Sequence, residues 1–141
     1  MKKILSDVKE SFFKIKRWAE NKVAYSAVIL IYHRVINIET DRQLLAVKKE
    51  NFIRQIKWLK QNYNIISLQE LAAFISKSKS LPQRSIVITF DDGYFDNFSE
   101  AMPILEAMNV FATFFISTNN INSTCEFWWD SLEKVFLYKK N

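Results

Sequence analysis

Residues 85–93 read Ser-Ile-Val-Ile-Thr-Phe-Asp-Asp-Gly, an apolar run that ends in two acids and a glycine. The run is short and rich in β-branched side chains, which is typical of a strand buried on both faces. Gly93 is the only glycine in the chain, and glycine adopts positive φ angles without steric cost. We therefore expect a buried strand followed by a turn that presents Asp91 and Asp92. Asp-Gly after a strand is also a common turn signal without any function, so these residues alone leave a plain turn and an active site both open.

The sequence around this run alternates between strand-like and helix-like periods. A continuous apolar run at 26–32 predicts another strand buried on both faces, and it ends at His33. Strands and helices that alternate at this spacing predict a parallel α/β fold, in which functional groups gather where the strands end. His33 and the Asp91–Asp92 pair both occupy such ends. The expected strands cover 26–32, 64–66, 85–90 and 111–116, and the expected helices cover 48–62, 67–75, 96–108 and 126–138.

Local signals support two of these helices and restrict a third. Ser67 followed three residues later by Glu70 is a capping-box pattern at the start of a helix. Pro103 falls inside the helix expected at 96–108, so we expect it to restrict the helix start or to kink it. The helix at 48–62 has one apolar face, formed by Phe52, Ile56 and Leu59.

Composition limits the class of protein. At 141 residues, with 49% hydrophobic and 15% aromatic residues, the chain has enough apolar side chains for the core of one ordinary domain. Its 20 Lys and Arg exceed its 15 Asp and Glu to give a net charge of +5, but the charges are spread over several amphipathic segments. The sequence has no basic stripe and no base-reading motif, so we expect no nucleic-acid partner.

Cys125 is the only cysteine, which excludes a disulfide within the chain. A lone thiol in an apolar-flanked segment is more often inert than a metal ligand. We therefore expect Cys125 to serve in packing, and metal ligation by its thiol is the less favoured alternative.

Residues 1–24 have the pattern of a separate amphipathic helix ahead of a domain at 25–141. Apolar residues recur every three or four positions, with lysines on much of the opposite face. Charged residues interrupt the apolar run that a signal peptide needs, and no stretch approaches the roughly 20 apolar residues of a membrane span. The helix either docks on the domain or makes a peripheral contact with an anionic membrane surface. We therefore expect a cytoplasmic or membrane-peripheral location.

The run Thr89-Phe90-Asp91-Asp92-Gly93-Tyr94, followed by Asp96-Asn97, resembles the first motif of the NodB-type polysaccharide deacetylases. Other segments resemble the family in the same order, so that the similarity covers most of residues 26–138. An ordered set of weak matches is more specific than any one of them, and it favours an active site over a plain turn. The supporting segments are Tyr32-His33-Arg34-Val35, Phe52 through Trp58-Leu59, Ala101-Met102-Pro103-Ile104-Leu105, Ala112-Thr113-Phe114-Phe115-Ile116 and Phe127-Trp128-Trp129-Asp130.

The resemblance implies a distorted (β/α) barrel and metal-dependent hydrolysis of the N-acetyl amide of an amino-sugar polymer. Asp91 would act as general base on a water molecule, and Asp92 would bind a divalent metal, with zinc as the expected ion. His33 would be the general acid that protonates the leaving amine, and a structural histidine at the strand end is the open alternative. Neighbouring strand residues point to opposite sides, so Gly93 would permit the turn that brings both acids to one site.

One feature of the family is missing from the sequence. The family completes its metal site with two histidines from a later motif, whereas this chain contains one histidine, His33, ahead of the acids. We therefore expect the N-terminal half of a deacetylase barrel, with an incomplete metal site and little activity on its own. Either a second chain supplies the missing half, as the product of a split or interrupted gene, or the fragment is a decayed remnant. An unpaired sheet edge and uncovered apolar helix faces should follow.

Two other classes of function stay open at this stage. One is a non-catalytic carbohydrate-binding or interaction module, in which Tyr94, Trp128 and Trp129 stack on sugars, although large aromatic side chains are more often buried in the core. The other is a membrane-surface protein that uses the helix at 1–24. The resemblance favours the deacetylase, with an N-acetylated polysaccharide as its substrate, and that family often acts at the cell envelope.

Overall fold

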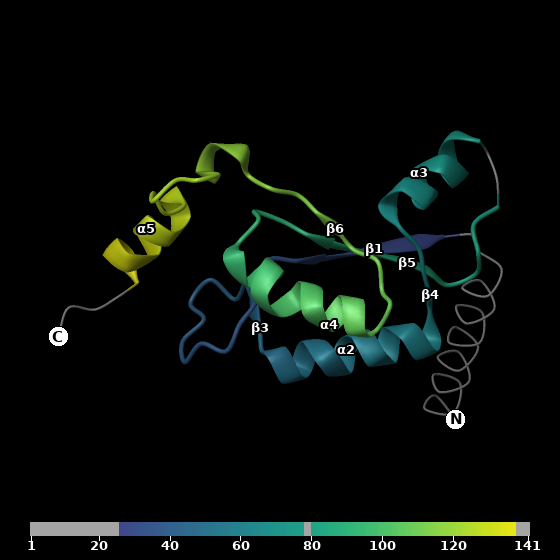
Figure 1. Ribbon diagram of the computed structural model, residues 1–141, viewed down its shortest axis with the longest axis horizontal. Coiled ribbons are helices and arrows are strands. Elements are labelled where there is room, and N and C mark those ends of the chain that lie inside the picture. Colours follow the sequence, from purple (N-terminus) through teal and green to yellow (C-terminus); the bar gives the residue numbers. More distant parts are fainter. Residues whose placement is uncertain (1–25, 78–79, 138–141) are drawn as a thin grey trace, which may run out of the picture.

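A computed structural model describes residues 26–77 and 80–137, and the predicted amphipathic helix at 1–24 lies outside them. At its centre is a parallel sheet in which β5 (Ser85–Phe90) lies between its neighbours (Figure 1). β1 (Ala27–Tyr32) pairs with β5 along its whole length on one side. The predicted α/β class with parallel strands is confirmed. The prediction that these elements form half of a distorted barrel stays a prediction.

The remaining strands are short. On the side of β5 away from β1, β4 (Asn64–Ile65) pairs with the start of β5 and β6 (Thr113–Phe114) pairs with its end. A separate parallel pair joins β2 (Arg34–Val35) to β3 (Ala46–Val47). β5 is therefore the strand that connects the other three strands of the main sheet.

Helices cover both faces of β5 (Figure 1). Every residue of β5 is buried, as predicted. Ile86, Ile88 and Phe90 join one apolar cluster, and Val87 points to the opposite face and joins a second cluster. α2 (Lys49–Asn62) and α4 (Met102–Ala107) contribute to the first cluster, and α3 (Leu68–Ser76) contributes to the second.

The helix signals in the sequence are confirmed in α2 and α3. The apolar face of α2 buries the three residues that were predicted for it, Phe52, Ile56 and Leu59. At the start of α3, the backbone N–H of Glu70 donates to the Ser67 hydroxyl at 3.1 Å, and the Ser67 N–H donates to the Glu70 carboxylate at 2.8 Å. This capping box satisfies two N–H groups that the helix would otherwise leave without a partner.

β1 is less buried than its sequence predicts. Val28 is 51% exposed and Ile31 is 59% exposed, whereas the prediction placed both faces of this strand in the core. The helices pack their buried residues over β5, so β1, one strand further out, is only partly covered. Within the described residues β1 pairs with β5 alone, which agrees with the expected open edge.

Two predicted elements differ in length or type. The strand predicted at 111–116 is reduced to β6, because its backbone meets only the last two residues of β5. The helix predicted at 96–108 is divided into a π-helical turn at Asn97–Ala101 and α4. Pro103 lies in the first turn of α4, where its missing N–H is tolerated, so the regular helix begins there.

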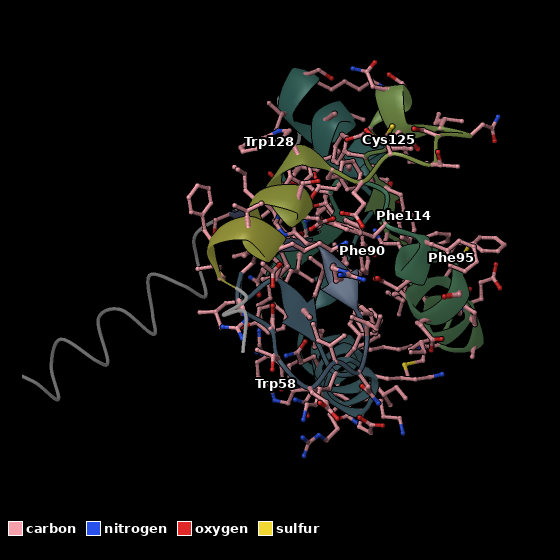
Figure 2. The ribbon with its side chains drawn as sticks, turned by 90° about the vertical axis from the view of Figure 1, so that its left-hand side faces the viewer. Trp58, Phe90, Phe95, Phe114, Cys125 and Trp128 are labelled. Carbon is pink, nitrogen blue, oxygen red and sulfur yellow. The ribbon has the colours of Figure 1, made fainter. Side chains whose placement is uncertain are left out.

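α5 (Trp128–Phe136) is a helix, as predicted, but it buries none of its residues. It extends beyond the end of the sheet, away from α2, α3 and α4 (Figure 1). Trp128 is 68% exposed, so the prediction that it lies in the core is wrong. Cys125, in the segment before α5, is exposed as well, so its predicted role in packing is wrong too. Figure 2 shows Trp128 at the outside, whereas Phe90 and Phe114 lie near the centre.

The described helices are all too short or too polar to cross a membrane.

Candidate active site

The turn after β5 is centred on Asp92. The Asp91 N–H donates to the Tyr32 carbonyl at 2.9 Å, which ties the turn to the end of β1. The Gly93 N–H then donates to the Asp91 carbonyl at 2.9 Å, so the turn closes over three residues. Gly93 has a φ of 75°, as the sequence predicts, but Asp92 also has a positive φ, of 70°. A non-glycine residue held in this conformation is strained, and such strain clusters at functional sites.

Gly93 also permits a close approach by the segment after β6. A Cβ at Gly93 would lie 3.0 Å from Ile116 Cγ2 and 3.2 Å from Ile116 Cα, closer than unstrained atoms approach. Two backbone hydrogen bonds hold that segment in place. Phe115 N–H donates to the Phe90 carbonyl at 2.8 Å, and Ser117 N–H donates to the Asp92 carbonyl at 3.3 Å. The segment therefore forms a wall beside the two acids.

Asp91 and Asp92 line one hollow of about 400 Å³, together with Phe115, Ile116 and Ser117. The structure therefore brings the two acids to one site, at the end of the central strand. His33 is not one of the residues that line this hollow. It follows β1 at the same edge of the sheet. The catalytic and metal-binding roles of Asp91, Asp92 and His33 stay predictions.

The pKa of Asp92 shows which charges surround the hollow. Burial raises the pKa of this carboxyl above its usual value, and the negative charges of Asp91 and Asp130 raise it further. The positive charge of His33 acts in the opposite direction. His33 and Asp130 therefore both lie within electrostatic reach of Asp92. The sequence predicted this for His33 and gave no reason to expect it for Asp130.

Asp96 is a buried acid to which the sequence analysis assigned no role. Its Oδ2 accepts from Arg34 Nε and from Arg34 Nη2, each at 2.9 Å, and its Oδ1 accepts from the Val35 N–H at 3.0 Å. Three donors on one carboxylate stabilise the charge that burial would otherwise disfavour. Asp96 therefore fixes the backbone directly after His33. The available signal was its position three residues after Gly93, inside the motif that carries the resemblance.

Tyr94 connects this edge of the sheet to α5. The Arg34 guanidinium carbon lies 4.5 Å from the centroid of the Tyr94 ring. The Tyr94 hydroxyl donates to Asp130 Oδ1 at 2.9 Å and accepts from Trp129 Nε1 at 2.7 Å. Burial, with a smaller effect of Asp130, holds the pKa of Tyr94 far above its usual value, so the hydroxyl keeps its proton.

The aromatic residues that were considered for sugar stacking are mostly occupied by the protein. Tyr94 is covered by Arg34 and uses its hydroxyl within the chain. Trp129 stacks on Phe127 with ring centroids 4.6 Å apart and planes 7° apart. Trp128 is the member of the set that is largely exposed.

A metal ion needs more ligands than the described residues supply. Zinc sites in enzymes use three protein ligands and an open position. Residues 26–77 and 80–137 contain no group of three or more His, Cys, Asp or Glu side chains arranged to hold a metal ion. Asp92 offers one carboxylate, and His33 is the only histidine of the chain. These residues do not complete the predicted zinc site.

Comparison with known proteins agrees with the geometry of this edge. A family model described as polysaccharide deacetylase matches residues 78–136, which include β5, the acid-bearing turn and α5. The solved structure of IcaB from Ammonifex degensii superimposes with a TM-score of 0.64 at 27% identity, over 71% of this chain and 42% of that one. The chain belongs to the NodB-type polysaccharide deacetylases.

Two curated members of the family are named for one substrate. The poly-β-1,6-N-acetyl-D-glucosamine N-deacetylase of Staphylococcus epidermidis is 32% identical over 112 residues, which are 70% of this chain and 38% of that protein. The enzyme of the same name from Escherichia coli K12 is 29% identical over 100 residues, which are 70% of this chain and 14% of that protein. This polysaccharide deacetylase chain therefore spans well under half the length of these relatives.

Proposed function

We propose that the chain contributes the strand-end acids to a hydrolase that removes acetyl groups from an N-acetylated amino-sugar polymer. The observation that carries this proposal is the shared hollow of Asp91 and Asp92 at the end of the buried central strand. The relatives named above favour poly-β-1,6-N-acetylglucosamine as the polymer. The membership of the family supports the reaction class.

The proposed reaction is the hydrolysis of an amide. A water molecule adds to the acetyl carbonyl carbon while Asp91, as general base, accepts a proton from the water. The C–N bond then breaks, acetate leaves, and the sugar nitrogen takes a proton to become the free amine. His33 is the proposed donor of that proton, because it follows β1 at the edge of the sheet where Asp91 and Asp92 follow β5.

The missing ligands are part of the same proposal. Asp92 would be the one metal ligand that the described residues provide, and a further polypeptide segment would supply imidazole ligands and the rest of the barrel. The relatives are long enough to contain such a segment, since this chain matches 38% of the Staphylococcus epidermidis enzyme. The exposed apolar side chains of β1 offer an edge for it. On this account the chain alone has little activity.

Acetate release tests the proposal. The chain is produced alone and together with the part of the Staphylococcus epidermidis enzyme that follows the matched segment, and each sample is given zinc and a β-1,6-linked N-acetylglucosamine oligomer. We expect acetate release from the combined sample and little from the chain alone. In the combined sample, Asp91→Asn and Asp92→Asn should each remove the activity.

Glu106→Gln is the matched control, because Glu106 is an exposed acid on α4. This variant should keep the activity of the parent. A combined sample in which the two polypeptides bind each other and release no acetate would contradict the proposal. So would release that survives Asp91→Asn.

A further inference from the structure

A second and larger cavity, of about 960 Å³, lies beside the hollow that holds the acids, and none of the roles proposed above uses it. Gly93, Tyr94 and Phe95 form one side of this cavity. Because Gly93 directly follows Asp92, the cavity begins where the candidate active site ends. Its volume is at the upper end of the range of roughly 300–1,000 Å³ that is usual for small-molecule sites.

The other sides come from the β2–β3 loop and from α5, and hydrogen bonds hold them together. Gln43 Nε2, in the loop, donates to Glu133 Oε2 at 2.6 Å and to Asp130 Oδ1 at 3.3 Å. Asp130 also accepts from the Tyr94 hydroxyl at 2.9 Å. Loop, turn and helix are thus joined in one network, so the cavity exists before a ligand enters. A preformed site reduces the ordering cost of binding.

The cavity lining combines an exposed aromatic ring with many hydrogen-bond acceptors. Phe95 is 76% exposed, and Figure 2 shows it projecting outward, away from Phe90 and Phe114. An exposed aromatic face suits the C–H face of a sugar ring, which is the apolar side of an otherwise polar molecule. Gln43 and Asp130 bring polar atoms to the same space. An ionised carboxylate has about four acceptor positions, so Asp130 can accept from sugar hydroxyls as well as from the protein.

The charges of the lining select against one class of sugar. Acidic side chains outnumber basic ones around the cavity. Of the basic ones, Arg34 is paired with Asp96, and Lys134 is paired with Glu126. A carboxylate-bearing sugar would therefore meet net repulsion, whereas an uncharged N-acetylated sugar would not.

We propose that this cavity is a binding subsite for an uncharged N-acetylhexosamine unit, next to the unit that loses its acetyl group. The choice of polymer rests on the proposed function. Phe95 packs against the ring of the bound sugar, and the network of Gln43, Asp130 and Tyr94 holds the walls at the spacing that the ring needs.

Binding without turnover tests the subsite on the 141-residue chain itself. The chain is titrated with a β-1,6-linked N-acetylglucosamine tetramer while NMR follows its backbone amides and indole N–H groups. We expect shifts at Gly93, Phe95 and the Trp129 indole, and none at the Trp58 indole. Phe95→Ala should weaken binding about three- to tenfold, as expected for the loss of one aromatic contact.

Phe111→Ala is the matched control, because Phe111 is also exposed and lines a different cavity. It should leave the affinity unchanged, and an oligomer of a hexuronic acid should not shift the cavity amides. Equal losses for Phe95→Ala and Phe111→Ala, or tetramer binding that leaves the Gly93 and Phe95 amides unshifted, would overturn the subsite. Cavity binding without acetate release in the combined sample would contradict the deacetylase alone, and acetate release without cavity binding would contradict the subsite alone.

Discussion

β5 and β1 are two strands of equal length and similar composition in very different surroundings. β5 reads Ser-Ile-Val-Ile-Thr-Phe and is buried throughout, whereas β1 reads Ala-Val-Ile-Leu-Ile-Tyr and exposes three of its large apolar side chains, Val28, Ile29 and Ile31. β5 has strand partners on both sides and helices over both faces, and β1 has one described partner. The difference teaches that composition predicts the strand, while the position in the sheet decides its burial.

The same contrast affects the candidate site. Asp91 and Asp92 follow the buried central strand, and His33 follows the exposed edge strand. The bond from the Asp91 N–H to the Tyr32 carbonyl joins the two strand ends, and Asp96 fixes the backbone after His33. The acids are therefore placed by the core, and the histidine depends on these two connections.

The largest expected effect is on core packing. Ile88→Ala should lower the free energy of unfolding by about 2–5 kcal/mol, because Ile88 is fully buried and its removal leaves a cavity. Ile31→Ala, on the exposed side of β1, should cost less than about 1 kcal/mol. Urea denaturation of both variants measures the two values. Equal costs would show that β1 is as well packed as β5.

The connection at Asp96 should have the next largest effect. Asp96→Asn removes the negative charge that Arg34 faces. It should lower the free energy of unfolding by about 1–3 kcal/mol. The imidazole resonances of His33 should broaden or shift in this variant, because Asn has one acceptor oxygen and its NH2 group must face either Arg34 or the Val35 N–H, which are both donors. Glu106→Gln serves again as the exposed control. Unchanged His33 resonances would contradict the inference that Asp96 fixes the backbone after His33.

Gly93→Ala should lower the free energy of unfolding by a smaller amount, about 1–2 kcal/mol. An alanine there is strained at positive φ, and its Cβ meets Ile116. In an Ile116→Ala background the loss should shrink without disappearing, because the contact with the Ile116 backbone remains. Thermal denaturation of the single and double variants measures this. A Gly93→Ala variant as stable as the parent would mean that the turn after β5 adjusts freely.

The smallest expected effect concerns the ionisation of Asp92. Because burial raises its pKa in the folded state, the ionised form costs stability at pH values above the folded pKa, and protonation relieves this cost as the pH falls. Asp92→Asn should therefore stabilise the chain slightly at pH 7 with a chelator present, and this gain should vanish below about pH 4. Denaturation at a series of pH values tests the sign. A gain that does not change with pH would show that the backbone conformation of Asp92, and not its charge, is responsible.

Much of the fold could be predicted from the sequence, because the signals were local. The apolar run of β5, the apolar face of α2 and the capping box at Ser67 each depend on neighbours within a few residues. The exposure of β1 and Trp128 could not be predicted, since it depends on which distant elements cover them. β6 is short for the same reason, because its partner is only the end of β5.

The candidate site was predictable in part. The turn that brings Asp91 and Asp92 to one hollow followed from the only glycine in the chain. The positive φ of Asp92 did not, because aspartate adopts that conformation only when its surroundings enforce it. Asp96 and Asp130 act through partners far away in the sequence, Arg34 and Tyr94, and only the folded chain brings these groups together.

The role of Asp91 as general base is tested most directly by the rate of acetate release in the combined sample. The rate is measured with native Asp91 and with Asp91→Asn. If Asp91 is the general base on the central strand, Asp91→Asn should lower the rate by at least about 100-fold while the tetramer still binds the cavity. An unchanged rate in Asp91→Asn would contradict the assignment of this strand end as the active site.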